Sequence, residues 1–285
     1  MSAGVEADYS YCLSVLRDTD RDRYLACLLA PEAKRGPLAA LYAFYAEIAR
    51  IRDVVHEPLP GEIRLQWWRD LLEGQSAGDA GGNPLAAALL RCISAHRLPV
   101  DVLVNMTEAR IFDLYNDPME SRAALEGYAG ETASALIQLA SLILDHENAA
   151  RSADAAGHAG VAQTVAGTLL LLPIHRRRGQ VYIPSDLLAA TGLSPQDLIA
   201  GKDGEAAGRA IEAFCGLGRD HLRKAREASG GISPGNFPAF LPISVAPYIL
   251  DRAEALGAAL LDRQILPAQW RRQWWMWRAL RRRRF

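Results

Sequence analysis

The chain has 285 residues, of which 50% are hydrophobic, so it is long and apolar enough to form one large core. Its 32 basic and 33 acidic side chains give a formal net charge of -1, which excludes a global positive field for nucleic acid. The four cysteines are far apart and lack the paired spacing of zinc sites, which favours buried thiols in a reducing compartment.

Ala and Leu dominate the apolar residues, so helix is favoured over strand through most of the chain. Apolar side chains at three- and four-residue steps predict one helix over 34–55, with Pro37 in its first turn, and another over 61–74. A Gly-rich loop is expected over 75–83. Further helices, with Pro or Gly at most junctions, are predicted over 84–96, 100–115, 121–144, 154 to about 173, 205–229 and 239–256.

The last segment, 268–285, reads AQWRRQWWMWRALRRRRF and interleaves Trp with Arg. We expect a partly packed helix that projects a basic end over 281–284, with contact between 270–285 and an anionic membrane surface as the alternative. No apolar run approaches the roughly 18 residues that span a bilayer, and the N-terminal residues show no secretory signal. The whole chain, 1–285, is predicted to form a single domain.

Three stretches follow one another in the order and spacing of a known family. Residues 22–44 read DRYLACLLAPEAKRGPLAALYAF, residues from 128 onward read YAGETASALIQLASLIL, and residues 158–184 read HAGVAQTVAGTLLLLPIHRRRGQVYIP. Together they resemble the squalene/phytoene synthase family. The resemblance implies an all-α helical bundle of the isoprenoid synthase type with a central cavity, in which two helices carry aspartate motifs.

Binding of a diphosphate through Mg²⁺ explains why that family needs two such motifs. Magnesium binds several oxygen ligands from carboxylates and waters, and two Asp residues four apart lie on one helix face. Counted from Tyr42, the first motif falls on Ala49 and Asp53, which leaves one carboxylate. A register shifted by three would place it on Arg52, Asp53 and His56, which is also incomplete.

The second motif, counted back from the Val-Tyr-Ile-Pro ending, falls on Leu171 and His175 and contains no carboxylate. Pro173 lies between them and is expected to kink or end the helix. We therefore expect no catalytic residue, no metal site and no cofactor. Mg²⁺ would be needed only if the chain is an active prenyltransferase, whose substitute carboxylates would come from Glu47, Glu57 or Glu62.

Several side chains are candidates for lining the cavity or for binding an anion: Tyr42, Asp53, Arg176, Arg177, Arg178 and Tyr182. The three arginines stand at a helix end, where guanidinium groups match phosphate oxygens without a metal, although the helix dipole alone favours them there. Asp53 could be a remnant ligand for magnesium or diphosphate, but a single acid beside Arg50 and Arg52 is more often one member of an ion pair. The tyrosines, with Tyr128, either line a prenyl-sized cavity or fill it. The histidines show no i, i+4 pairing and are interpreted as ordinary residues.

Within the family, residues 61–74, 173–188 and 237–242 resemble a branch with degenerate motifs, the mitochondrial complex I assembly factor 6 type. That resemblance implies a role in maturing NADH:ubiquinone oxidoreductase, through a subunit or an assembly intermediate, with a prenyl or lipid ligand as an option. The alternatives are an active prenyltransferase that condenses prenyl diphosphates and a carrier for an isoprenoid such as a quinone. Since no mitochondrial presequence is seen, a bacterial cytoplasmic relative is expected, with a peripheral association with the inner membrane left open.

Overall fold

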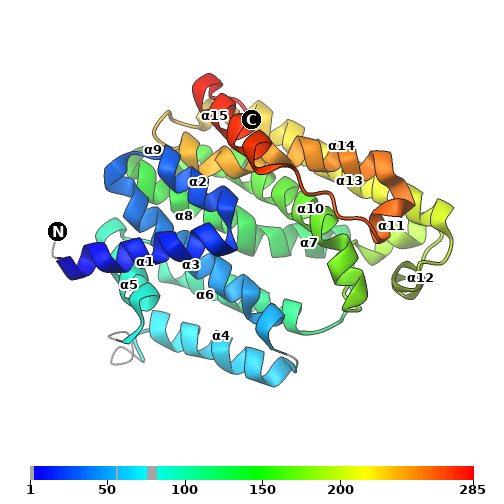
Figure 1. Ribbon diagram of the computed structural model, residues 1–285, viewed down its shortest axis with the longest axis horizontal. Coiled ribbons are helices and arrows are strands. Elements are labelled where there is room, and N and C mark those ends of the chain that lie inside the picture. Colours follow the sequence, from blue (N-terminus) through cyan, green and yellow to red (C-terminus); the bar gives the residue numbers. More distant parts are fainter. Residues whose placement is uncertain (1–2, 56, 76–81) are drawn as a thin grey trace. The chain divides into compact units, whose positions relative to one another are not determined.

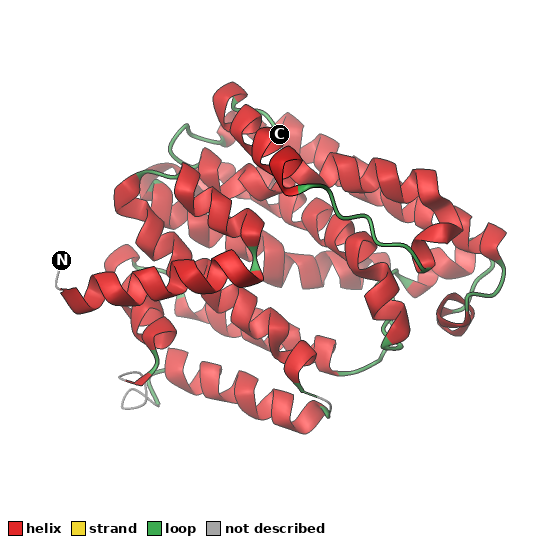
Figure 2. Cartoon of the chain, viewed as in Figure 1, coloured by secondary structure: helices red, strands yellow, loops and turns green. Residues whose placement is uncertain are grey.

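The computed structural model describes residues 3–55, 57–75 and 82–285. His56, part of the shifted register of the first motif, and residues 76–81 of the predicted Gly-rich loop lie outside the described residues. Within the described ranges every regular element is a helix, joined to the next by loops and turns (Figure 2). The prediction of an all-α fold is therefore confirmed.

The chain forms two compact units, each assembled from several segments. Unit 1 comprises Met1–Leu114, Ala135–Ala153 and Ile232–Leu241, and unit 2 comprises Tyr115–Ser134, Asp154–Gly231 and Pro242–Phe285. The single domain expected over 1–285 stays a prediction.

Unit 1 is organised around one long helix, α3, which is labelled in Figure 1. Its α-helices are α1 (Ala3–Thr19), α2 (Arg21–Leu29), α3 (Glu32–Val54), α4 (Pro58–Leu72), α5 (Pro84–His96), α6 (Val100–Ala109), α8 (Ala135–Leu144) and α9 (His146–Ala149). Short 3₁₀ helices cover Arg110–Leu114 and Ala150–Ser152. Helix α3 packs against α1, α2, α5 and α8, and it buries Leu38, Phe44 and Ile48. Helix α4 packs against α6, buries Trp68 and leaves Trp67 half-buried.

Unit 2 contains two long helices and several short ones. Its α-helices are α7 (Arg122–Ala129), α10 (Ala153–Arg177), α11 (Ser185–Ala190), α12 (Pro195–Ala200), α13 (Gly204–Glu227), α14 (Ala246–Leu256) and α15 (Gln269–Arg282). A π-helical turn covers Gly130–Ser134, and 3₁₀ helices cover Ala228–Gly231 and Gly257–Leu261. A further 3₁₀ helix, Phe237–Val245, begins in unit 1 and ends in unit 2. Helix α13 packs against α11 and α14.

Local sequence signals explain where several helices begin and end. The Asn83 side chain accepts hydrogen bonds from the first amides of α5, and the Ser121 hydroxyl does the same for α7. Ser194 and Asp197 form a reciprocal capping box at the start of α12, which ends at Gly201 in the left-handed conformation. Pro84 and Ser121 stand at the predicted starts of α5 and α7, whereas α12 was not predicted.

The sequence prediction missed or misplaced other helices. Helices α1 and α2 were not predicted, and α3 begins at Glu32, so Pro37 lies inside the helix and not in its first turn. One missing N–H removes a single helical hydrogen bond, a loss that the heavily buried face of α3 offsets.

The helix predicted over 121–144 is interrupted by the π-helical turn. The Thr132 hydroxyl donates to the Tyr128 carbonyl at 2.6 Å, and the Ser134 hydroxyl donates to the Gly157 carbonyl of α10 at 2.9 Å. A Cβ on Gly160 would lie 2.3 Å from the Ser134 backbone nitrogen, so only glycine allows α10 to approach this turn so closely. The turn therefore fixes α7 against α10.

Pro173 does not end its helix, because α10 continues to Arg177. That part of the expectation was wrong. Pro173 is itself buried, together with Leu169 and Leu172. Packing of this apolar face offsets the one backbone hydrogen bond that proline removes in the interior of the helix.

One described helical stretch, His146–Arg177, is long and apolar enough to cross a membrane by length and composition, contrary to the expectation from the sequence. However, 61% of its most apolar window is buried within the structure, and the core helix of a globular protein passes the same test. The finding is weak evidence for a membrane span.

Candidate functional site

The first-motif positions lie near the end of α3 in unit 1. Ala49 is half-buried and Asp53 is exposed, one turn apart on the same helix face. The Arg52 guanidinium donates to the Val55 carbonyl at 3.3 Å, which stabilises the helix end. The surface of this turn therefore presents a single motif carboxylate, that of Asp53.

Closer to the core of unit 1, α3 places a tyrosine between two arginines. The Arg23 guanidinium of α2 lies 4.6 Å from the centroid of the Tyr45 ring, and the Arg110 guanidinium lies 4.8 Å from it. Each arginine has an acidic partner: Asp20 for Arg23, and Asp113 for Arg110 at 2.9 Å. Sequence reasoning did not identify this group, which we call the Tyr45 cluster.

Tyr42, a predicted cavity residue, belongs to the same region and is 2% exposed. The Arg23 guanidinium lies 6.0 Å from its ring centroid. Burial raises the pKa of the Tyr42 hydroxyl well above its usual value, and the nearby Cys27 adds to the shift. Tyr42 is thus a neutral core side chain of unit 1.

The second-motif positions lie at the end of α10 in unit 2. Leu171 is exposed and His175 is half-buried. The His175 ring packs against Tyr182, with centroids 4.6 Å apart, and Tyr182 lies 6.3 Å from Tyr128. The structure therefore brings together three predicted residues, and their contacts are aromatic.

An irregular segment holds Tyr182 in place. The Met119 amide donates to the Val181 carbonyl at 2.9 Å, and the Ser185 amide donates to the Met119 carbonyl at 2.8 Å. These bonds pair the Val-Tyr-Ile-Pro stretch with the residues before α7, and they leave Tyr182 only 9% exposed.

The three arginines predicted to bind an anion differ in their surroundings. Arg176 donates through Nε to the Ile199 carbonyl at 2.8 Å and forms an ion pair with Asp262 at 2.6 Å. Arg177 and Arg178 are exposed at the end of α10. Arg176 therefore connects α10 to two other segments of unit 2, and the exposed guanidinium groups at this helix end are those of Arg177 and Arg178.

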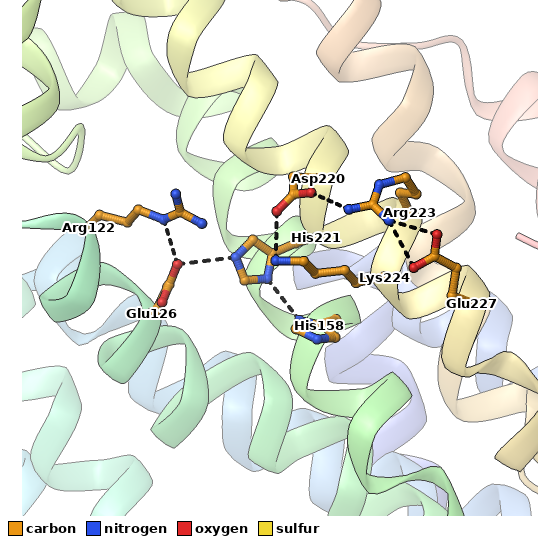
Figure 3. Close-up of polar contacts among 8 residues, drawn as sticks. All are labelled: Arg122, Glu126, His158, Asp220, His221, Arg223, Lys224 and Glu227. Carbon is orange, nitrogen blue, oxygen red and sulfur yellow. Dashed lines mark hydrogen bonds and ion pairs between the residues drawn. The ribbon is translucent and has the colours of Figure 1, made fainter.

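A polar cluster that the sequence did not reveal lies elsewhere in unit 2, and Figure 3 shows its side chains. The Nδ1 atoms of His158 on α10 and His221 on α13 are 3.1 Å apart, and His221 Nε2 lies 3.2 Å from a carboxylate oxygen of Glu126 on α7. Arg122 donates to the same Glu126 oxygen at 2.8 Å. We call these four residues the His221 cluster.

The electrostatics of the His221 cluster depend on burial. Burial lowers the pKa of His221 more than the Glu126 carboxylate raises it, and His158 and Lys224 lower it further. Burial raises the pKa of Glu126, but the hydrogen bonds from Arg122 and His221 outweigh that effect and lower it. Because two Nδ1 atoms face each other, one imidazole must accept while the other donates. The two rings therefore share one hydrogen bond, in which only one of the two Nδ1 atoms carries the proton.

On the exposed side of α13, the cluster continues into surface ion pairs (Figure 3). Asp220 pairs with Lys224 at 2.8 Å and with Arg223 at 2.6 Å, which lowers the pKa of Asp220 to about 2. Arg223 also pairs with Glu227. Such exposed pairs contribute little to stability.

Sequence reasoning missed the His221 cluster because its members come from three helices. His158 and His221 are 63 positions apart, so no i, i+4 spacing marks them. The single local signal is Arg122 and Glu126 at i, i+4 on α7. Within the ranges that the structure describes, no group of three or more His, Cys, Asp or Glu side chains is placed to hold a metal ion.

Comparison with known proteins agrees with the fold and extends it to a family. Residues 16–278 match the model of the squalene/phytoene synthase family. The chain is 30% identical over 247 residues to NADH dehydrogenase (ubiquinone) complex I, assembly factor 6, of Rattus norvegicus. That match covers 86% of this chain and 74% of the relative. The chain is also 26% identical over 274 residues to phytoene synthase 3, chloroplastic, of Zea mays. This second match covers 90% of this chain and 61% of the relative.

Among solved structures, the squalene synthase of Alicyclobacillus acidocaldarius matches with a TM-score of 0.76 at 19% identity. The match covers 90% of this chain and 97% of that one, and it shows the fold alone. The isoprenoid-synthase-type fold expected from the sequence is thereby confirmed. Because residues 16–278 of its 285 match the family model, the chain belongs to the squalene/phytoene synthase family.

Proposed function

We propose that this chain is a non-catalytic member of its family that assists the assembly of a respiratory NADH dehydrogenase complex. The observation that carries the proposal is the side chains at the two motif positions: Ala49, Asp53, Leu171 and His175. The similarity to assembly factor 6 supports the assembly role, because the two sequences are 30% identical over 86% of this chain.

The donor set at these positions does not fit magnesium. Mg²⁺ takes oxygen ligands in a near-octahedral arrangement, and in phosphate sites one or two carboxylates hold it together with waters and phosphate oxygens. The family's two motifs supply such carboxylates from two helices. The four motif positions provide one carboxylate, on α3. Helix α10 has one acidic residue, Asp154, which is 21 positions before His175 and so about 30 Å away along the helix axis. The second helix therefore has no substitute carboxylate near the motif.

The alternative function is an active Mg²⁺-dependent prenyltransferase, which the similarity to a phytoene synthase favours. Its substitute carboxylates, Glu47, Glu57 and Glu62, all belong to unit 1, on α3, at the N-cap of α4 and within α4. This alternative needs a carboxylate partner from another helix, and α10 offers none near its C-terminal end.

An activity assay separates these two functions. The purified chain is incubated with farnesyl or geranylgeranyl diphosphate and Mg²⁺, and diphosphate release is measured. We expect no release above buffer. Release that depends on Mg²⁺ and is abolished by Asp53→Ala would overturn the proposal.

A genetic test addresses the assembly role directly. Deletion of the gene in its host should lower the amount of assembled NADH dehydrogenase complex, measured by activity staining of native gels. The wild-type chain and the Asp53→Ala variant should both restore it, because the role does not require the remaining carboxylate. Rescue by the wild type alone would indicate that Asp53 is needed.

The proposal also includes a prenyl or lipid ligand, bound without a metal in a central cavity as in a carrier. Calorimetric titration with a non-hydrolysable farnesyl diphosphate analogue tests it. Binding that is equal with and without Mg²⁺ would support a ligand role, and no binding under either condition would leave a role through protein contacts. A cytoplasmic location in a bacterium, which was expected from the sequence, is likewise a proposal.

A further inference from the structure

The C-terminal helix α15 presents tryptophans to solvent. Trp270, Trp274 and Trp277 are 64%, 50% and 43% exposed, although Trp is normally among the more buried residues. Their positions at i, i+4 and i+7 place them on one face of the helix. Trp274 and Trp277 stack with ring centroids 5.3 Å apart, and a hollow in the surface is lined by the three rings and Gln273.

The opposite face of α15 anchors the helix to unit 2. Met276 and Ala279 are buried, and the Trp275 ring packs on Tyr248 with centroids 5.0 Å apart. The chain end is held as well, because Phe285 is buried and its carbonyl accepts a hydrogen bond from Arg226 Nε at 2.6 Å. The tryptophan face is therefore presented by a fixed helix and is not needed for its packing.

Arginines border this aromatic face. Arg271 lies over the Trp270 ring and Arg281 over the Trp277 ring, each 5.3 Å from the centroid. Residues 281–284 are four consecutive exposed arginines. The segment 268–285 holds seven of the 32 basic side chains and none of the 33 acids, so the rest of the chain is net negative.

We propose that the tryptophan and arginine face of α15 binds the surface of an anionic lipid bilayer. Trp rings favour the headgroup region of a membrane, and each basic side chain near an anionic surface strengthens binding about fivefold. The segment 268–285 contains no acidic residue, so its arginines can attract the many phosphates of an anionic lipid surface. The rest of the chain is net negative, which orients α15 toward that surface. This binding goes beyond the assembly role and does not depend on it.

Sedimentation of the purified full chain with lipid vesicles tests the proposal. The chain should bind vesicles of phosphatidylcholine and phosphatidylglycerol at least tenfold more tightly than vesicles of phosphatidylcholine alone, and added salt should weaken that binding. Brominated lipids should quench the tryptophan fluorescence of the bound chain. Failure to bind the anionic vesicles would overturn the proposal and would favour a protein partner for this face.

Two pairs of matched variants separate the two contributions. Trp270→Ser with Trp274→Ser should weaken vesicle binding at least tenfold, whereas Leu59→Ser with Ile63→Ser, which removes exposed apolar side chains from α4, should not. Arg281→Glu with Arg282→Glu should have an effect of similar size.

The control for the arginine pair is Arg21→Glu with Arg64→Glu, which makes the same change in net charge at exposed positions of unit 1. Circular dichroism establishes that each variant is folded. Equal losses in the α15 variants and their controls would contradict a specific face.

Discussion

The Tyr45 cluster of unit 1 and the His221 cluster of unit 2 both bring charged side chains from several elements into contact, but their chemistry differs. In unit 1 the cations are arginines, which stay protonated at any physiological pH, and each has an aspartate partner. In unit 2 the central groups are two imidazoles in contact, and burial lowers the pKa of one of them, His221. The first cluster therefore gains stability from cations that stay charged, whereas the lowered pKa of His221 makes the stability contributed by the second cluster depend on pH.

The largest expected effect comes from breaking the Tyr45 cluster. Arg110→Ala removes an ion pair whose two side chains are each about 10% exposed, together with the contact on Tyr45. Loss of one partner of a buried pair costs about 3 kcal/mol of unfolding free energy, and the loss should not vary between neutral and mildly acidic pH. Urea denaturation at two pH values measures it.

The matched control is Arg122→Ala, because Arg122 and Glu126 form an exposed pair in the other cluster. Its cost should stay below about 1 kcal/mol. Similar costs for the two variants would mean that burial does not distinguish the two clusters.

A second prediction concerns the packing that places His158. In Gly160→Ala, the new methyl group would meet the Ser134 backbone, so α10 must move from the π-helical turn. We expect a loss of about 2 kcal/mol, typical of overpacking. Gly167→Ala on the same helix, where no atom lies within 4 Å, should instead raise stability by up to about 1 kcal/mol. Thermal unfolding of both variants measures the difference, and equal shifts would contradict the close approach.

The smallest expected effect is the pH dependence of the His221 cluster. The folded pKa of His221 lies below its unfolded value, so the unfolded chain binds the proton more tightly. The unfolding free energy should therefore fall as the pH drops below about 6.5. Arg122, Glu126, His158 and Lys224 face this histidine and contribute to its environment.

Replacement by a side chain that does not titrate isolates this contribution. His221→Gln should flatten the fall in unfolding free energy between about pH 7 and pH 5. His146→Gln is the control, since His146 is exposed on α9 and lies outside the cluster. If the two variants flatten the profile equally, the cluster has no special role.

Much of the fold could be predicted from the sequence because its signals are local. Periodic apolar residues located most long helices, and Ser121 and Ser194 act as caps through side-chain oxygens a few positions away from the amides that they bind. Helices α1 and α2 were missed because few of their side chains are buried, which leaves a weak apolar pattern. The end of α10 was misplaced because the packing that offsets the missing hydrogen bond of Pro173 is a tertiary feature.

The candidate site was harder to predict, since its contacts join distant segments. The sequence shows which side chains stand where the family resemblance places the two motifs: Ala49 and Asp53, or Arg52, Asp53 and His56 in the shifted register, and Leu171 and His175. These site positions stay a prediction. Only the tertiary structure decided that Arg176 pairs with Asp262, that His158 meets His221, and that the tryptophans of α15 face solvent. The physical reason is that such contacts depend on how helices pack, and the period of a single helix carries no information about its neighbour.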